Sequence, residues 1–364
     1  MMEAIMMKRI FILMLTAILL LSAVPQGLAD DTPDPIPVIA KEDLSPTPKG
    51  LHHYMLICVD SWNADLTKPE DLYTDGMILV TVDENAHRVM LTIFVRDMLI
   101  QRPDGKYGRI NNILRLMSPK GDGKQGIQML IDTLNSHFDL QIEKFIVVDF
   151  KQVENIVDAI GGVDIHLKSR ERTRIESLGA SLPPENADGT THLKGYAAVM
   201  YMRIRKVVTA EYLHADGRTY SDTQEMGRNY RDSVVLSAIA EKLKDITPQD
   251  AMKLLDVILD NLVYTNMTTD DMLAAVDLAL LMQGRPVEHI SMPTNNPWIK
   301  NAKGTEVQLS PDFDLYKKYK DSEHPLSYCE MMVSGMAVKQ INYELNRKVL
   351  WDFLLDSFVV VDEE

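Results

Sequence analysis

The fold is decided by residues 144–167, which read KFIVVDFKQVENIVDAIGGVDIHL. The first six residues are rich in β-branched and aromatic side chains and predict a strand over Lys144–Asp149. Lys151–Ile160 has helical periodicity and runs into Gly161-Gly162, a pair typical of a helix end. A further strand is expected over Val163–Leu167. This succession predicts a βαβ-like unit and therefore an α/β protein.

The same alternation continues on both sides of this unit. Towards the N-terminus we expect strands over Tyr54–Val59, Gly76–Val82 and Val89–Val95, and a helix over Gly126–Phe138. Residues 169–192 gather glycine, proline and asparagine and are predicted to be a surface loop. Beyond them we expect helices over His192–Met202, Arg231–Lys244, Pro248–Leu262 and Asp270–Gln283, a strand over Val287–Met292 and a terminal helix over Tyr343–Leu355. No second domain boundary is evident.

The N-terminus has the features of an export signal. Lys8-Arg9 precedes an apolar run over residues 10–24, and small residues lead to Ala29. The run is shorter than the roughly 20 residues that a membrane-spanning helix needs, so residues 1–29 are predicted to be a cleaved signal peptide. An uncleaved signal anchor is the alternative, and both place the remaining chain outside the cytoplasm. Residues 30–50 carry five prolines and are predicted to be a Pro-rich tether.

Composition excludes several classes of function. The chain of 364 residues has a formal net charge of −15 and no block of basic residues, which argues against nucleic acid as a partner. Its two cysteines, Cys58 and Cys329, exclude a disulfide-rich scaffold and a paired-cysteine zinc site, and we do not expect them to form a disulfide with each other. The nine histidines show no HExxH spacing, and no serine has GxSxG context.

Two carboxylates stand next to predicted strands. Asp60 follows the first strand, and Asp75 precedes the second. Such a pair suits a hard cation, because Mg²⁺ prefers oxygen ligands and completes its shell with water and phosphate. The competing interpretation is that both residues merely cap turns.

Arginines recur at the ends of predicted elements. A guanidinium can bind phosphate oxygens through two hydrogen bonds, although each of these arginines alone could equally form a solvated ion pair. Arg203 and Arg205 would share one face of an extended stretch, and the opening of a helix near Arg228 also favours an anion. In an otherwise acidic chain, this accumulation predicts a pyrophosphate site built from Arg96, Arg109, Arg203, Arg205, Arg228 and Arg231.

The order of these motifs resembles the LytR/CpsA/Psr (LCP) family of Gram-positive cell envelope transferases. The resemblance covers residues 51–247 and, more loosely, reaches residue 316. It rests on Cys58-Val59-Asp60, Tyr73-Thr74-Asp75, Val95-Arg96-Asp97, Arg109-Ile110-Asn111, Val157-Asp158-Ala159-Ile160-Gly161-Gly162-Val163-Asp164, Arg203-Ile204-Arg205-Lys206 and Glu225-Met226-Gly227-Arg228-Asn229-Tyr230-Arg231-Asp232. It implies a three-layer α/β/α sandwich with a central mixed sheet over residues 51–316, followed by a partly helical extension over residues 317–364.

The resemblance also implies an activity and a set of site residues. The family moves a polyprenyl-pyrophosphate-linked glycopolymer, such as teichoic acid or capsule, onto a peptidoglycan hydroxyl at the outer face of the cytoplasmic membrane. Carried over to this chain, Asp60 and Asp75 would hold Mg²⁺, and Glu225 would be the base. The pyrophosphate would be bound by Arg96, Arg203, Arg205 and Arg228, with Arg109 where the family often has lysine.

Two departures from the family pattern leave alternatives open. Tyr73 replaces a phosphate-binding arginine and offers only one hydrogen bond, and Asp232 adds a negative charge close to the expected anion. A binding protein that keeps the lipid pyrophosphate pocket but has weakened transfer is therefore the alternative function. A third interpretation is hydrolysis of polyprenyl pyrophosphate, with water as the acceptor.

Overall fold

A computed structural model describes residues 32–204, 210–213, 218–222, 225–244, 246–260, 262–301, 303–322 and 324–355. The predicted signal peptide over residues 1–29 lies outside this part of the chain. Within the described residues, no helix combines the length and the apolar character needed to cross a membrane.

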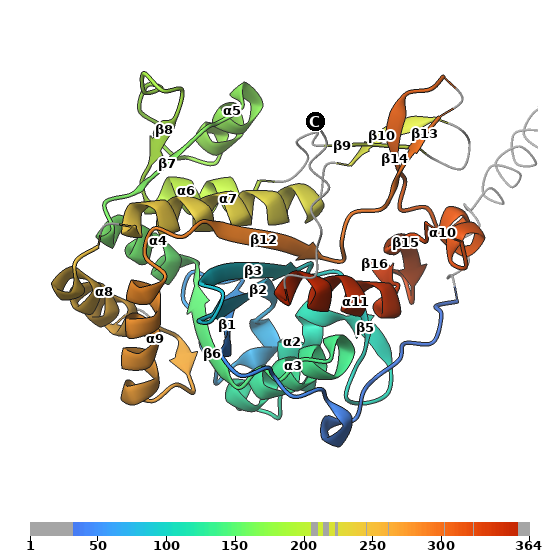
Figure 1. Cartoon of the computed structure of the whole chain (residues 1–364), viewed down its shortest axis with the longest axis horizontal. Helices are drawn as coiled ribbons and strands as arrows, with labels where there is room; N and C mark the ends of the chain where they lie inside the picture. Colours follow the sequence, from blue (N-terminus) through green and yellow to red (C-terminus); the bar gives the residue numbers. More distant parts are fainter. Residues whose placement is uncertain are drawn as a thin grey trace, which may run out of the picture.

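A six-stranded sheet forms the centre of the molecule (Figure 1). Its strands β1 and β6 are parallel, as are β3 and β12, whereas the remaining neighbours are antiparallel, so the sheet is mixed. In spatial order it consists of β11 (Tyr264–Thr265), β6 (Lys144–Asp149), β1 (Leu51–Val59), β2 (Thr74–Asp83), β3 (Arg88–Phe94) and β12 (Val287–Met292). The strands predicted from sequence at these places are confirmed.

Helices cover both faces of the sheet (Figure 1). Alternate residues of β1 point to opposite faces: Met55 and Ile57 pack into the main core, and Leu56 and Cys58 face the other side. The main-core face is covered by α2 (Ile113–Met117), α3 (Gly123–Phe138) and α11 (Tyr343–Leu354), and the opposite face by α4 (Phe150–Ala159), α6 (Gly195–Met202) and α7 (Glu225–Leu243). The expected three-layer α/β/α sandwich is thus confirmed.

The passage from β6 into α4 follows the expected local rules. Asp149 caps α4, because its side chain accepts from the Gln152 backbone N–H while the Gln152 side chain accepts from the Asp149 backbone N–H. Gly161 and Gly162 end the helix at φ values of 82° and 85°, a left-handed conformation that glycine adopts without strain. The prediction of a βαβ-like unit is wrong at its second strand, however. Strand β7 (Val163–Ile165) leaves the central sheet and pairs with β8 (Thr191–Leu193).

The loop predicted over residues 169–192 is also wrong in part, because it contains α5 (Ser169–Ser177). This charged segment has little apolar periodicity, and its helix is fixed by tertiary contacts through the buried side chains of Glu171 and Ile175. The helix predicted from His192 begins at Gly195 instead, because Thr191–Leu193 is taken up by β8.

The remaining elements surround this sandwich. Helices α8 (Pro248–Asp260) and α9 (Thr269–Leu281) form a pair beside β6, and α10 (Phe313–Tyr319) follows later. A second sheet has the order β10 (Thr219–Asp222), β9 (Ala210–Leu213), β14 (Glu306–Leu309) and β13 (Trp298–Lys300). Two ribbons consist of β4 (Leu99–Gln101) with β5 (Tyr107–Arg109), and of β15 (Tyr328–Val333) with β16 (Met336–Ile341).

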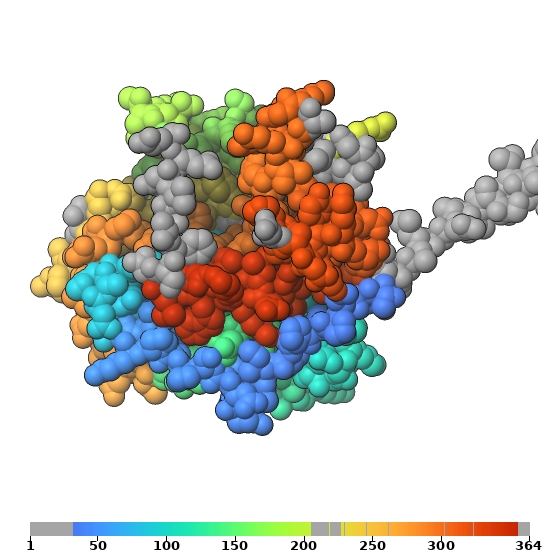
Figure 2. Space-filling view, turned by 45° about the vertical axis from the view of Figure 1, so that its right-hand side comes forward, coloured from blue at the N-terminus to red at the C-terminus, as the bar shows by residue number. Residues whose placement is uncertain are grey.

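Both ends of the described chain pack against the sandwich. Residues 32–50 run beneath α11 in Figure 2, where Ile36 is buried and the Ile39 N–H donates to the Ser136 carbonyl at 2.9 Å. Arg347 of α11 donates to the carbonyl of Pro37. Leu350 and Leu354 of the same helix belong to the main core, so the segment beyond residue 317 contributes to that core.

Candidate functional site

The strand order brings one group of charged residues to a single edge of the sheet. Because β1 and β2 are antiparallel, the end of β1 at Val59 lies opposite Thr74 at the start of β2. Asp60 and Asp75 therefore become neighbours, and the Asp60 N–H donates to the Tyr73 carbonyl at 2.8 Å. Arg96 follows the end of β3 at the same edge.

Asp75 is the centre of this group. One of its oxygens, Oδ2, accepts from Nη1 of Arg96 at 2.7 Å and from Nη1 of Arg228 at 3.1 Å. The Asp75 side chain is only 3% exposed and that of Arg228 only 6%. Burial alone would raise the pKa of Asp75, but Arg228 and Arg96 lower it to about 2. Asp75 is thus held as a carboxylate between two guanidinium groups.

Asp60 and Arg203 form the more open half of the group. Their Oδ1 and Nη2 atoms are 3.6 Å apart, and each side chain is about one third exposed. Burial, followed by repulsion from Asp75, raises the pKa of Asp60. The Arg203 guanidinium also lies 4.3 Å from the centroid of the Phe150 ring, a cation–π contact that fixes its position at the end of α6.

The pKa of Asp75 predicts how stability depends on pH. Its folded pKa of about 2 lies below its ordinary value of 3.8, so the carboxylate stabilises the fold above about pH 4, and this contribution disappears as the pH falls through about 2. The contribution is on the order of 2 kcal/mol. In urea unfolding, Asp75→Asn should therefore lose less stability than the wild type between about pH 5 and pH 2. Asp270→Asn, at an exposed position, is the control and should follow the wild type; parallel curves for Asp75→Asn and the wild type would contradict the prediction.

Two predicted phosphate contacts are directed elsewhere. The Arg109 guanidinium donates to the carbonyl of Ala337 in the β15–β16 ribbon, with 2.7 Å from Nε, rather than joining Asp75. The Tyr73 ring lies under Arg115, whose guanidinium carbon is 5.2 Å from the ring centroid. Arg109 thus contacts the C-terminal ribbon and the Tyr73 ring contacts a second arginine, and their roles in binding phosphate stay predictions.

The helix α7 carries the other predicted residues. Asp232 lies one turn beyond Arg228, is buried, and lines the same cavity as that arginine. Glu225 is the first residue of α7, and its side chain is outside the described part. Arg205 also lies outside the described residues. Their roles as base and phosphate ligand therefore stay predictions.

Sequence reasoning did not single out three residues that the fold brings to this edge. Asn111 is buried, and its Nδ2 is 3.5 Å from Oδ1 of Asp75, at the outer limit of a hydrogen bond. Arg115 is exposed beside Tyr73 and supplies a guanidinium close to the position where the family pattern has one. Phe150 supports Arg203. Only Asn111 had a sequence signal, since it ends the Arg109-Ile110-Asn111 motif.

An apolar cavity of about 110 Å³ opens beside the arginines. Arg203, Arg228 and Asp232 stand in its wall, and the other lining residues are almost all apolar side chains from the sheet and from α4, α6 and α7. They include Leu56, Cys58, Ile78, Val148, Val153, Val157, Val199, Val235, Leu236 and Ile239. Burial raises the pKa of the Cys58 thiol, and both Cys58 and Cys329 are free.

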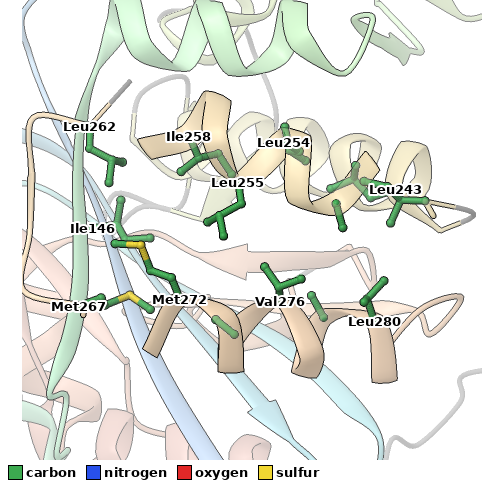
Figure 3. A pocket seen from close by; sticks show the side chains of 14 residues that line it. Ile146, Leu243, Leu254, Leu255, Ile258, Leu262, Met267, Met272, Val276 and Leu280 are labelled. Atoms are coloured by element: carbon green, nitrogen blue, oxygen red, sulfur yellow. The ribbon is translucent and has the colours of Figure 1, made fainter. Parts of the chain in front are cut away.

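A second, larger cavity of about 260 Å³ lies between α8 and α9 (Figure 3). Its lining is apolar throughout, from Ile146 of β6 and Leu243 of α7 to Leu254, Leu255 and Ile258 of α8 and Met272, Val276 and Leu280 of α9. Figure 3 shows Leu255 pointing from α8 toward α9, and Met272, Val276 and Leu280 pointing from α9 toward α8. No residue of α8 is buried, so its apolar face is only half covered by protein.

The carboxylates fit a divalent cation only as a partial ligand set. Among the described residues, no group of three or more His, Cys, Asp or Glu side chains could hold a metal ion. Asp60 and Asp75 are both oxygen donors, and burial first, then repulsion from Asp75, raises the pKa of Asp60. Mg²⁺ often takes one or two carboxylates and completes its shell with water and phosphate oxygens, so this pair fits it.

Comparison with known proteins identifies the family of the chain. The sequence model of the LytR_cpsA_psr family matches residues 55–317. The chain is 25% identical over 190 residues to biofilm regulatory protein A of Streptococcus mutans, covering 52% of this chain and 43% of that protein. It is 27% identical over 226 residues to the polyisoprenyl-teichoic acid–peptidoglycan teichoic acid transferase TagU of Oceanobacillus iheyensis, covering 61% of each. The matches thus span about half the length of these relatives.

The fold also resembles a solved structure. The crystal structure of TagV from Bacillus subtilis superposes with a TM-score of 0.51 at 18% identity, covering 85% of this chain and 99% of that one. At this identity the likeness establishes the fold alone.

Proposed function

Because the chain belongs to the LytR_cpsA_psr family, we propose that it is an extracytoplasmic phosphotransferase. Its donor is a polyprenyl-pyrophosphate-linked anionic glycopolymer, and its acceptor is a peptidoglycan hydroxyl at the outer face of the cytoplasmic membrane. The relative TagU of Oceanobacillus iheyensis is named a polyisoprenyl-teichoic acid–peptidoglycan teichoic acid transferase, which supports this assignment.

One observation carries the proposal: a cationic group and an apolar cavity share a wall. Arg203 and Arg228 line the cavity between the sheet and α7. Arg96 is next to them, because Arg96 and Arg228 donate hydrogen bonds to the same oxygen of Asp75. A ligand that suits both parts has an anionic head and a long hydrocarbon tail, because charged groups need paired charge and hydrocarbon avoids water. A prenyl pyrophosphate has both properties.

The reaction assigns a role to each part of the site. The acceptor oxygen attacks the phosphorus that bears the glycan, the bond from that phosphorus to the bridging oxygen breaks, and polyprenyl phosphate leaves. Glu225 takes the proton of the attacking hydroxyl. Arg96, Arg203 and Arg228 hold the phosphate oxygens and offset their charge. When bound at Asp60 and Asp75, Mg²⁺ would supply further charge compensation on those oxygens.

Two elements carry apolar side chains from the cavity beside the arginines to the cavity between α8 and α9. Val148 lines the near cavity and Ile146 the far one, two residues apart on the same face of β6. Ile239 and Leu243, one turn apart on α7, line the near and far cavities in the same order. We propose that the far end of the prenyl chain fills the gap between α8 and α9.

A substitution that fills the far cavity should discriminate between prenyl chains. Val276→Trp places a large ring between α8 and α9, so octaprenyl pyrophosphate should bind at least about tenfold more weakly, the equivalent of about 1.4 kcal/mol of lost burial. Farnesyl pyrophosphate, too short to use both cavities, should bind as before. Leu273→Trp, at an exposed position of the same helix, is the matched control. An equal loss of affinity for both ligands would contradict the proposed position of the prenyl chain.

Turnover decides between transfer and binding alone. The full chain would be given a polyprenyl-pyrophosphate-linked glycan, peptidoglycan and Mg²⁺, and the appearance of glycan on peptidoglycan would be followed. Transfer that Arg203→Ala abolishes supports the proposal. Tight lipid binding without transfer would instead favour the binding protein suggested by Tyr73 and Asp232, and glycan released into solution would favour hydrolysis.

A further inference from the structure

A row of aromatic side chains leads outward from Arg203. The guanidinium of Arg203 lies over the Phe150 ring, whose centroid is 5.6 Å from that of Trp62 in an edge contact. Trp62 stacks in turn on Tyr196, with ring centroids 5.7 Å apart and an interplanar angle of 28°. The row begins at the ion site and ends on the surface, because Phe150 is buried whereas Trp62 and Tyr196 are 38% and 37% exposed.

The two outer rings are held firmly by the backbone around them. The Phe150 N–H donates to the Ser61 carbonyl at 2.9 Å, and the Ala64 N–H donates to Oδ2 of Asp149 at 2.9 Å, which fixes the loop that carries Trp62. The Tyr196 hydroxyl donates to the Leu178 carbonyl at 3.0 Å. The rings therefore present a preorganised surface, and little conformational entropy remains to be lost on binding.

We propose that Trp62 and Tyr196 form a sugar-binding platform that stacks against the hexosamine rings of the acceptor glycan. This inference rests on the proposed function, since it places the acceptor beside the phosphate group that Arg203 holds. Tryptophan and tyrosine are enriched at interaction surfaces, because each combines a large apolar ring with a polar group.

The chemistry of the platform favours a saccharide over the prenyl chain and over the anionic glycopolymer. The faces of aromatic rings are electronegative and attract the weakly positive C–H groups on the face of a pyranose, while the sugar hydroxyls stay hydrated. A prenyl chain would leave hydrocarbon in water on this open surface. An anionic polymer would need a surplus of cations, but Arg203, the charged member of the row, is paired with Asp60, and Lys68 of the segment that follows Trp62 is paired with Asp65.

Tryptophan fluorescence and calorimetry test the platform directly. In the full chain carrying Trp298→Phe and Trp351→Phe, Trp62 is the single tryptophan, and its emission should change on addition of chitotetraose or soluble peptidoglycan fragments. By calorimetry, Trp62→Ala and Tyr196→Ala should each weaken binding of these saccharides about tenfold or more. Trp298→Ala removes a ring on β13 that is more exposed than Trp62, and it should leave the affinity unchanged.

The outcomes separate this inference from the proposed function. Octaprenyl pyrophosphate without sugar should bind equally well to Trp62→Ala and to the wild type. If the wild type does not bind this lipid, the proposed function is contradicted, whereas the saccharide measurements still test the platform. Unchanged saccharide affinity in a folded Trp62→Ala variant would overturn the platform. So would a loss confined to the glycan of the lipid-linked donor, because the platform would then hold the donor sugar.

Discussion

Arg228→Ala is expected to lose about tenfold to a hundredfold in affinity for prenyl pyrophosphate and to destabilise the fold by about 3 kcal/mol. The first effect arises because Arg228 lines the cavity and offers a charge-assisted contact to the anion. The second arises because the carboxylate of Asp75, 3% exposed, would lose the Arg228 guanidinium, which lies 3.1 Å from its Oδ2. Both effects come from one side chain, since Arg228 connects α7 to the start of β2.

The two effects can be measured separately. Calorimetric titration with octaprenyl pyrophosphate gives the affinity, and urea unfolding without ligand gives the stability. Arg228→Lys should fall between the wild type and Arg228→Ala in affinity, because it keeps the charge but not the two-pronged geometry. Arg170→Ala on the exposed side of α5 is the control. Wild-type lipid affinity in a folded Arg228→Ala protein would exclude the arginine from the binding site.

Arg231→Met is expected to destabilise the fold by about 3–5 kcal/mol. Arg231 is completely buried, donates to the Ile204 carbonyl and lies 3.8 Å from Glu171, which is also buried. Removing the guanidinium would leave the Glu171 carboxylate without this cation in an apolar setting. The contact joins α7 to α5, so the loss should also loosen the charged helix that local sequence does not sustain.

A double substitution distinguishes charge burial from loss of packing. Arg231→Met combined with Glu171→Gln should recover part of the stability lost in Arg231→Met alone, because the stranded negative charge is gone. Arg285→Met, at an exposed position, should unfold like the wild type. Additive losses in the double variant would mean that the two residues do not interact energetically.

Much of the fold could be predicted from local sequence. Strand β6 and the start and end of α4 follow from β-branched residues, a capping aspartate and a glycine pair, all of which act within a few residues. The expected βαβ-like unit was wrong because β7 takes β8 as its partner, and partner choice depends on residues far apart in the chain. Helix α5 was missed for the same reason, since its anchor, Glu171, meets Arg231 of a distant helix.

The sequence by itself determined the kinds of element, their order and the charged residues at their ends, because these follow from side-chain chemistry and spacing over short distances. Only the tertiary structure decided which charges meet. In the folded chain, Arg96 and Arg228 donate hydrogen bonds to Asp75. Arg109 donates to the C-terminal ribbon, and Trp62 stacks on Tyr196. These contacts join residues that are tens to hundreds of positions apart, and they form because burying the apolar faces of the sheet forces their elements together.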